Sequence, residues 1–297
     1  MQKHEIVRRF LDEGILISPQ LLASLENENL EEAISEAKAV NAPVFSSKKP
    51  YEVSIQKNEI RGKLEPADMA SFYKSKYEGI RDLLKNRVDA VSINRLGNVF
   101  GDTAAIGMVS ELFPNGFVIE DTTASIQVIS KERPDIDDVI AVKGAVRENR
   151  IFASEVIYPD IPILRKIKSL SMSIAFLEAG QQAAADIRFS FEPADACKLI
   201  PNPAHIRVKK DGESMYIVAY QPPSEIGIRK AAELLKKRHL MLDKSQIKAG
   251  SDCFILREEP DIVWIMSRTS EKLVYKGTLV VCGPAVINLQ TKHVDFI

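Results

Sequence analysis

Cysteine and long hydrophobic stretches are both scarce in this chain of 297 residues. The three cysteines, Cys197, Cys253 and Cys282, are scattered and form no CxxC pair. This excludes the framework of a small disulfide-stabilised domain and argues against a structural zinc site. No apolar run approaches the ~20 residues that cross a bilayer. Residues 1–5 (Met-Gln-Lys-His-Glu) form a polar start and not a secretory signal. We therefore expect a cytoplasmic protein that binds no membrane.

Histidine and phosphate-binding glycine motifs are also scarce. The chain has four histidines, His4, His205, His239 and His293, and they are far apart in the sequence. We expect each to be solvated or satisfied in the core, because an isolated histidine is more often structural than a ligand. The sequence contains no GxGxxG motif, no P-loop and no nucleophile elbow. We expect no metal and no cofactor.

Charge of one sign does not dominate, since the net charge is −1. The distribution is nevertheless uneven. Residues 100–160 hold five basic and eleven acidic residues, a net charge of −6, and residues 161–297 hold 20 basic and 15 acidic residues, a net charge of +5. Neither part is basic enough to indicate a nucleic-acid partner from charge alone.

The first part of the chain is predicted to be helical and then irregular. Residues 1–40 form a small helical unit, with an apolar face at residues 6–11 and a second helix after Ser18-Pro19. Residues 41–75 are interrupted by prolines and are predicted to be a linker, in which residues 51–55 give at most a stray strand. A helical pattern returns from Ser71 to Asn86.

Residues 76–162 are predicted to be a small barrel preceded by that helix. Five short runs are β-branched or alternate, and tight polar turns separate them: 104–112, 116–120, 124–130, 139–146 and 150–157. An OB-fold is the economical way to close five such strands. Its aromatics Phe113, Phe117 and Phe152 are interpreted as core or rim, and Asp135, Asp137 and Asp138 as a solvated turn.

Residues 163–297 are predicted to form a second, mostly β domain. Short β-like runs occur at 173–176, 187–191, 205–208, 215–220, 254–257, 262–265 and 278–282, and one helix is predicted from Glu225 to Arg238. The last turn of this helix is basic, which suits the helix dipole. The chain as a whole is thus an α+β, mostly β protein.

Several short motifs in this second domain occur in a suggestive order. They are an Asn202-Pro203 turn, a Pro260-Asp261-Ile262 strand, a Tyr275-Lys276-Gly277 strand and a final strand that ends in Gly283. Their layout resembles a calcineurin-like phosphoesterase domain, in the version found in the small subunit of archaeal family-D DNA polymerase. Residues 106–109 and 118–123 similarly resemble the OB domain of polymerase small subunits. The resemblance implies a shortened phosphoesterase-type β-sandwich in the second domain.

The metal-binding motifs of that family are missing from this chain. Glu178 follows the strand where Asp-x-His is expected, and Gln221 stands where a histidine is expected. Residues 266–269 (Met-Ser-Arg-Thr) replace Gly-His-x-His, so that Ser267 and Thr269 occupy the two histidine positions. Two bridging metals need several His, Asp and Asn ligands, which this sequence does not supply. The resemblance therefore implies a degenerate phosphoesterase without catalytic residues.

The resemblance implies a scaffold in DNA replication or repair: a non-catalytic accessory subunit whose partner is a polymerase large subunit or another replication protein. It would contact DNA only within that complex. Two other functions stay open. An active metal-dependent 3′–5′ exonuclease would require unusual ligands that include Glu178. A stand-alone single-stranded-DNA-binding module would use the OB barrel, against the net charge of that part.

Partner binding is assigned to the face around the degenerate loop, with Trp264, Met266, Arg268 and Tyr275 as contacts. For Trp264 itself a place in the core is favoured over a surface anchor. Residues Gln290–Ile297 have the outline of a sliding-clamp-binding peptide, although a final strand that closes the domain is the simpler interpretation.

Overall fold

The computed structural model describes residues 3–17, 22, 34, 37, 44–45, 51–59, 61, 63–98 and 101–297. Its first unit contains α1 (Lys3–Asp12) and a parallel pair of short strands, β1 (Leu16–Ile17) and β2 (Val44–Phe45). Ile6 and Phe10 of α1 pack with Ile15, so the apolar face predicted for residues 6–11 is present in part. The second helix predicted after Ser18-Pro19 lies outside the described residues.

A long helix, α4 (Pro66–Lys85), begins five residues before the predicted start at Ser71. Pro66 occupies its first turn, and the Asp68 carboxylate accepts a hydrogen bond from the Glu65 backbone N–H at 3.0 Å. Proline at a helix start and a capping carboxylate stabilise a helix terminus. Pro66 lies within the predicted linker of residues 41–75, so the predicted start of the helix at Ser71 is five residues too late.

The barrel agrees closely with its prediction. After a short 3₁₀ turn, η2 (Ile93–Asn98), the chain forms five strands: β4 (Asp102–Phe113), β5 (Gly116–Glu120), β6 (Ser125–Ile129), β7 (Val139–Arg147) and β8 (Arg150–Ile157). They close in the order β4-β5-β6-β8-β7, with β6 and β8 parallel. A five-stranded barrel of this connectivity is an OB-like barrel. Its core is filled by residues such as Val109, Phe117 and Ile140.

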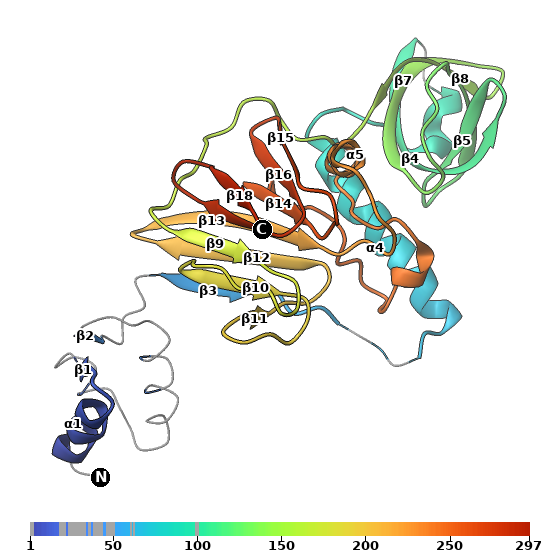
Figure 1. The fold of residues 1–297 in the computed structure, drawn as a ribbon. Coiled ribbons are helices and arrows are strands. Elements are labelled where there is room, and N and C mark those ends of the chain that lie inside the picture. The colour runs from blue at the N-terminus through green and yellow to red at the C-terminus, as the bar shows by residue number, and fades with distance from the viewer. Residues whose placement is uncertain are drawn as a thin grey trace.

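The rest of the chain forms two sheets that pack face to face, hereafter the sandwich (Figure 1). The six-stranded sheet has the order β15-β16-β14-β13-β12-β3, and the five-stranded sheet has the order β11-β10-β9-β17-β18. The strands are β3 (Glu52–Ile55), β9 (Ser173–Phe176), β10 (Ile187–Ser190), β11 (Lys198–Leu199), β12 (Ala204–Lys210), β13 (Glu213–Tyr220), β14 (Ile262–Ile265), β15 (Glu271–Tyr275), β16 (Thr278–Cys282), β17 (Ala285–Asn288) and β18 (Val294–Phe296).

Two segments differ from their predictions. The strand predicted at residues 51–55 is present as β3, but it is not stray: it pairs with β12 at the sheet edge, a long-range pairing that local periodicity does not reveal. Residues 254–257, predicted as a strand, make only an isolated bridge between His239 and Ile255. The final strand β18 pairs with β17, as the simpler interpretation of the C-terminal residues predicted.

The outer face of the six-stranded sheet is covered by helices. Helix α5 (Ile228–Lys237), three residues shorter at its start than predicted, buries Ala231, Leu234 and Leu235 there. A short 3₁₀ turn, η3 (Lys244–Gln246), follows it. None of the helices in the described part of the chain is long and apolar enough to span a membrane.

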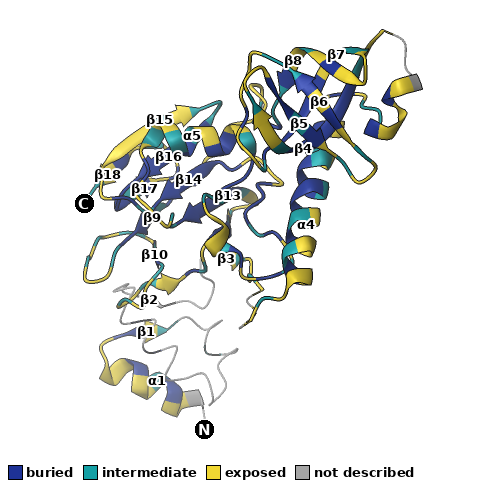
Figure 2. Ribbon diagram, turned by 90° about the vertical axis from the view of Figure 1, so that its right-hand side faces the viewer, coloured by how far each residue is buried: buried dark blue, intermediate teal, exposed yellow. Residues whose placement is uncertain are grey.

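Helix α4 joins the barrel to the sandwich (Figure 2). Phe72, in its first half, packs into the core beneath α5. Ile80 and Leu84, in its second half, pack against strands β4 and β7 of the barrel. One apolar helix face therefore contributes to two cores, which holds the two domains together.

Candidate functional site

The predicted site residues follow the carboxyl ends of strands in both sheets. Strands β13, β14 and β16 run parallel, so their carboxyl ends meet at one edge of the six-stranded sheet. Gln221 follows β13 and Ser267 follows β14. Strand β9, which precedes Glu178, ends beside them because Phe176 stacks on Trp264 with ring centroids 4.6 Å apart. The structure thus brings the degenerate positions to the same end of the sandwich.

A network of hydroxyl and carboxylate groups occupies the loop after β14. The Ser267 hydroxyl donates to the Glu225 carboxylate and lies 2.8 Å from the Thr269 hydroxyl. The same carboxylate accepts from the Arg268 backbone N–H at 2.9 Å. The hydrogen bond from Ser267 lowers the pKa of Glu225. These contacts link the loop to Glu225 and leave Ser267 only 3% exposed.

The loop also lies very close to the chain that follows β16. The backbone N–H of Gly283 donates to the Ile265 carbonyl at 3.0 Å, and a Cβ at Gly283 would approach the Thr269 carbonyl oxygen to 2.5 Å. Gly283 also has a φ of +92°, a conformation that favours glycine. This accounts for the glycine at the end of the final parallel strand.

The residues at this edge do not fit a pair of metal ions. Glu178 contributes a single half-buried carboxylate, and its backbone N–H donates to Gln181. The backbone of Gln221 exchanges two hydrogen bonds with the Asn202 side chain, at 2.7 and 3.0 Å. Within the described ranges, no three His, Cys, Asp or Glu side chains gather as a metal-ligand group. Two metals that share a phosphate require several such ligands.

The two buried histidines are satisfied by protein groups, as predicted. His205 contacts the Tyr216 hydroxyl at 2.5 Å and the Cys253 carbonyl at 2.7 Å. His239 pairs with Asp252 at 2.8 Å. Burial lowers the pKa of both imidazoles. The structural interpretation of these two histidines is confirmed.

Trp264 is completely buried, with 0% of its surface exposed. Its ring stacks on Phe176 and on Phe191, and its indole N–H donates to the Gly283 carbonyl at 2.7 Å. The favoured interpretation of Trp264 as a core residue is confirmed. Its side chain is therefore not available as the surface contact that the assignment of a partner face required.

The other predicted contacts do not form one patch. Met266 packs partly against the sandwich core, and Arg268 is exposed at the carboxyl end of β14. Tyr275 lies at the opposite end of the sheet, because antiparallel β15 pairs Tyr275 with Thr278 at the start of β16. There its hydroxyl donates to Asp160 at 2.9 Å. The prediction that Tyr275 and Met266 share a face is wrong, since the direction of β15 separates them.

The acidic turn of the barrel is an interdomain contact and not the solvated loop that was predicted. Lys237 of α5 contacts Asp135 at 2.5 Å and Asp138 at 2.8 Å, and the Asp138 side chain is 10% exposed. Lys244 contacts Asp137 at 3.4 Å. A pocket of about 320 Å³ lies beside these pairs. It is also lined by Lys76, whose pKa is lowered by burial. No local sequence signal indicates this contact, because the partner residues are about a hundred positions apart in the chain.

One comparison with known proteins gives a partial match. No family model matches this chain. It is similar to the DNA polymerase II small subunit of Archaeoglobus fulgidus, with 27% identity over 118 residues, which is 36% of this chain and 24% of that protein. The chain thus spans about a quarter of the length of the curated relative that it matches. The similarity indicates a relationship to polymerase small subunits.

Among solved structures, the telomere capping protein Ten1 from Saccharomyces pombe matches with 12% identity and a TM-score of 0.22. The match covers 23% of this chain and 78% of that protein. A likeness at this TM-score carries no weight for fold or function.

Proposed function

We propose that this chain is a non-catalytic accessory subunit of a DNA polymerase assembly of the family-D type, and that it acts as a scaffold for a large subunit. The observation that carries the proposal is the Ser267–Glu225–Thr269 network, which occupies the strand ends where the resemblance places metal ligands. The similarity to a polymerase small subunit supports the choice of assembly.

The architecture supports the same proposal. The two packed sheets fit a shortened, degenerate phosphoesterase-type sandwich. Parallel strands β9 and β10 are joined by residues 177–186 alone, with no crossover helix. Parallel pairs usually need a connection of a dozen or more residues, most often with a helix. A lost segment between these strands fits a domain that keeps its scaffold and lacks its catalytic half.

Copurification tests the proposal directly. The full chain would be co-expressed with the large subunit of a family-D-type polymerase, and the complex would be isolated by affinity and size-exclusion chromatography. We expect a stable complex, and no manganese-dependent hydrolysis of single-stranded DNA by the chain alone. Failure of the large subunit to copurify would contradict the scaffold role. Hydrolysis that Glu178→Gln abolishes would instead support an active exonuclease.

An aromatic and basic patch on the barrel supports single-stranded-DNA binding as a second candidate function. Phe152 is 43% exposed on β8, and Arg150 lies two residues away on the same face of that strand. Arg147 pairs with Arg150 across the β7–β8 hairpin. Stacking on an aromatic ring beside cations is how many OB barrels hold single strands. Fluorescence anisotropy of a labelled oligonucleotide tests this function. Wild type should bind with an affinity that falls as salt rises, and Phe152→Ala should bind more weakly than wild type.

Clamp binding through Gln290–Ile297 is not part of the proposal. Phe296 packs against the sandwich core, and β18 is hydrogen-bonded to β17. A clamp could bind these residues only after the strand had left the sheet.

A further inference from the structure

The segment that leads from the barrel into the sandwich, residues 162–169, has an unusual surface and is called the strap below. Figure 1 shows it as the yellow-green coil that arches over the end of the sandwich from the barrel side towards β9. Three of its side chains are large, apolar and highly exposed: Ile163 at 76%, Leu164 at 92% and Ile167 at 69%. Exposed aliphatics so closely spaced mark an interaction surface more often than a bare one.

The strap's backbone is unpaired as well. Within the described part of the chain, no backbone N–H or C=O of residues 162–169 takes part in a hydrogen bond. Only its side chains hold it in place, chiefly Arg165, which donates to the Gly277 carbonyl at 2.7 Å. A segment outside the helices and strands, with unpaired backbone donors and acceptors, can pair with an incoming strand.

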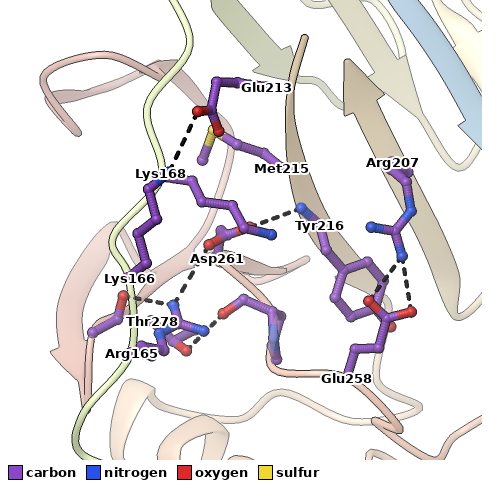
Figure 3. Close-up of polar contacts among 12 residues, drawn as sticks. Arg165, Lys166, Lys168, Arg207, Glu213, Met215, Tyr216, Glu258, Asp261 and Thr278 are labelled. Atoms are coloured by element: carbon purple, nitrogen blue, oxygen red, sulfur yellow. Dashed lines mark hydrogen bonds and ion pairs between the residues drawn. The ribbon is translucent and has the colours of Figure 1, made fainter. Parts of the chain in front are cut away.

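The strap carries the cations Arg165, Lys166 and Lys168, which face the carboxylates of Glu213 and Asp261 (Figure 3). Lys166 lies 3.4 Å from Glu213 in an exposed ion pair. The Asp261 carboxylate lies 3.9 Å from the Arg165 guanidinium and 3.7 Å from the Lys168 ammonium, both beyond ordinary hydrogen-bond distance. One of its oxygens accepts from the Tyr216 backbone N–H at 2.8 Å. The Arg165 side chain is only 11% exposed, and its Nε is buried without a hydrogen-bond partner.

A third cation joins this cluster from the β17–β18 hairpin. The Lys292 ammonium lies 3.6 Å from the Met215 sulfur, which is a weak acceptor. Burial lowers the pKa of Lys292 to about 8, with Asp261 acting to raise it and Arg165 to lower it further. Arg165, Lys168 and Lys292 thus share one carboxylate. The cluster has spare hydrogen-bonding capacity for an additional anion.

We propose that the strap binds an extended, acidic segment of the partner polypeptide, which adds as a strand along residues 162–169. Its apolar side chains cover Ile163, Leu164 and Ile167, and its carboxylates lie near Lys166 and Lys168. This deepens the proposed scaffold function and rests on it for the identity of the partner. The exposed apolar side chains favour a polypeptide over a nucleic acid, since phosphates gain nothing from aliphatic contacts. A second copy of this chain is disfavoured, because two straps of the same positive charge repel each other.

The strap is tested with peptide probes that do not depend on the large subunit. A 12-residue peptide of alternating glutamate and valine would be titrated against the full chain, beside an alternating lysine–valine peptide and a single-stranded oligonucleotide. Amide hydrogen exchange of residues 162–169 reports where each probe binds. We expect only the glutamate–valine peptide to protect the strap, with an affinity that falls as salt rises.

Two variants and their matched controls locate the contact. The triple variant Ile163→Ser, Leu164→Ser, Ile167→Ser and the charge variant Lys166→Glu, Lys168→Glu should each weaken the peptide at least tenfold. The controls change exposed residues elsewhere: Leu112→Ser with Leu199→Ser, and Lys198→Glu with Lys248→Glu. We expect the controls to bind within twofold of wild type.

The outcomes separate the two proposals. If the glutamate–valine peptide leaves the strap unprotected, if the lysine–valine peptide binds as well, or if the oligonucleotide protects the strap instead, the docking proposal is overturned. Copurification of the large subunit with the triple variant at wild-type yield also counts against the strap and leaves the scaffold function standing. Loss of copurification for wild type contradicts the scaffold function alone.

Discussion

The two ends of the parallel strands β13, β14 and β16 differ in how their polar groups are satisfied. At the carboxyl ends, Ser267 and Thr269 are held by Glu225 in a closed hydrogen-bond network. At the amino ends, Asp261 stands off from Arg165 and Lys168, and the strap above it has an unpaired backbone. The cations and backbone groups that lack full hydrogen-bond partners therefore lie at the amino ends, opposite to the end that carries the degenerate positions. The strap proposal places the partner polypeptide at this amino end of the sheet.

The largest effect on stability is expected at the buried residue Trp264, near the carboxyl end of β14. Trp264→Ala removes an indole that fills the sandwich core beside Phe176, and it should lower the free energy of unfolding by about 3–5 kcal/mol. Leu164→Ala, at a 92% exposed position of the strap, should change the same quantity by less than about 0.5 kcal/mol. Urea denaturation followed by circular dichroism measures both. If Trp264→Ala and Leu164→Ala destabilised the chain equally, the carboxyl end would not be more tightly packed than the strap at the amino end.

The next largest effect is expected at Asp261. Asp261→Ala leaves the buried Tyr216 backbone N–H without its acceptor and removes the counter-charge of Arg165 and Lys168. A buried donor left unsatisfied costs about 1–3 kcal/mol of unfolding free energy. Asp261→Asn keeps an acceptor for Tyr216 and should be less destabilising. If both variants unfold like wild type, Asp261 does not organise the amino end of the sheet.

The barrel could be predicted well from the sequence, because its strands and turns are specified by residues that are close together in the chain. Alternating apolar residues and tight turns such as 114–116 place five strands almost residue by residue. At Gly116 a Cβ would lie 1.9 Å from the Val128 carbonyl oxygen, so glycine is required at the start of β5. The charge of this part was also predicted, although its acidic turn proved to bind Lys237 of a distant helix.

The candidate site was predicted only in part, because it depends on strand direction. The degenerate positions were predicted to be together, and the parallel strands place Gln221 and Ser267 at one edge. Tyr275 was predicted as a partner contact beside Met266 and Arg268, and the antiparallel course of β15 carries it to the other end of the sheet. Sequence spacing does not reveal such reversals. The sequence shows that the strap contains several apolar residues, but it does not show that their side chains are exposed.

A smaller effect, dependent on pH, is expected at Lys292. Its pKa in the folded chain is about 8, below the ordinary value of 10.5, so the unfolded state binds more protons between these values. Stability should therefore rise as pH increases from about 8 to 10.5. Below pH 8, Lys292→Met should stabilise the chain by about 1 kcal/mol, a value reduced because the side chain is partly exposed. Urea melts between pH 7 and 10.5 measure the difference.

Lys292→Arg is the matched control for that measurement, because it keeps the charge and should not stabilise the chain. A wild-type profile that is flat between pH 8 and 10.5 would contradict the burial of the Lys292 ammonium at this end of the sheet. The strap proposal adds one consequence. An acidic peptide bound beside Lys292 should raise its pKa again and reduce the rise in stability with pH.

An effect of similar size is expected in the closed network at the carboxyl ends. Ser267→Ala removes one buried hydroxyl and should cost about 1 kcal/mol of unfolding free energy. The pKa of Glu225 is lowered by that hydroxyl, so its contribution is present above the ordinary value of 4.5 and is lost as pH falls through the lowered pKa. In Ser267→Ala this part of the acid dependence should disappear. NMR titration of the Glu225 side chain measures it. A Glu225 pKa unchanged by Ser267→Ala would show that the loop is held by its close approach to Gly283 and not by the hydroxyl network, and the contrast between the two ends would then rest on backbone packing.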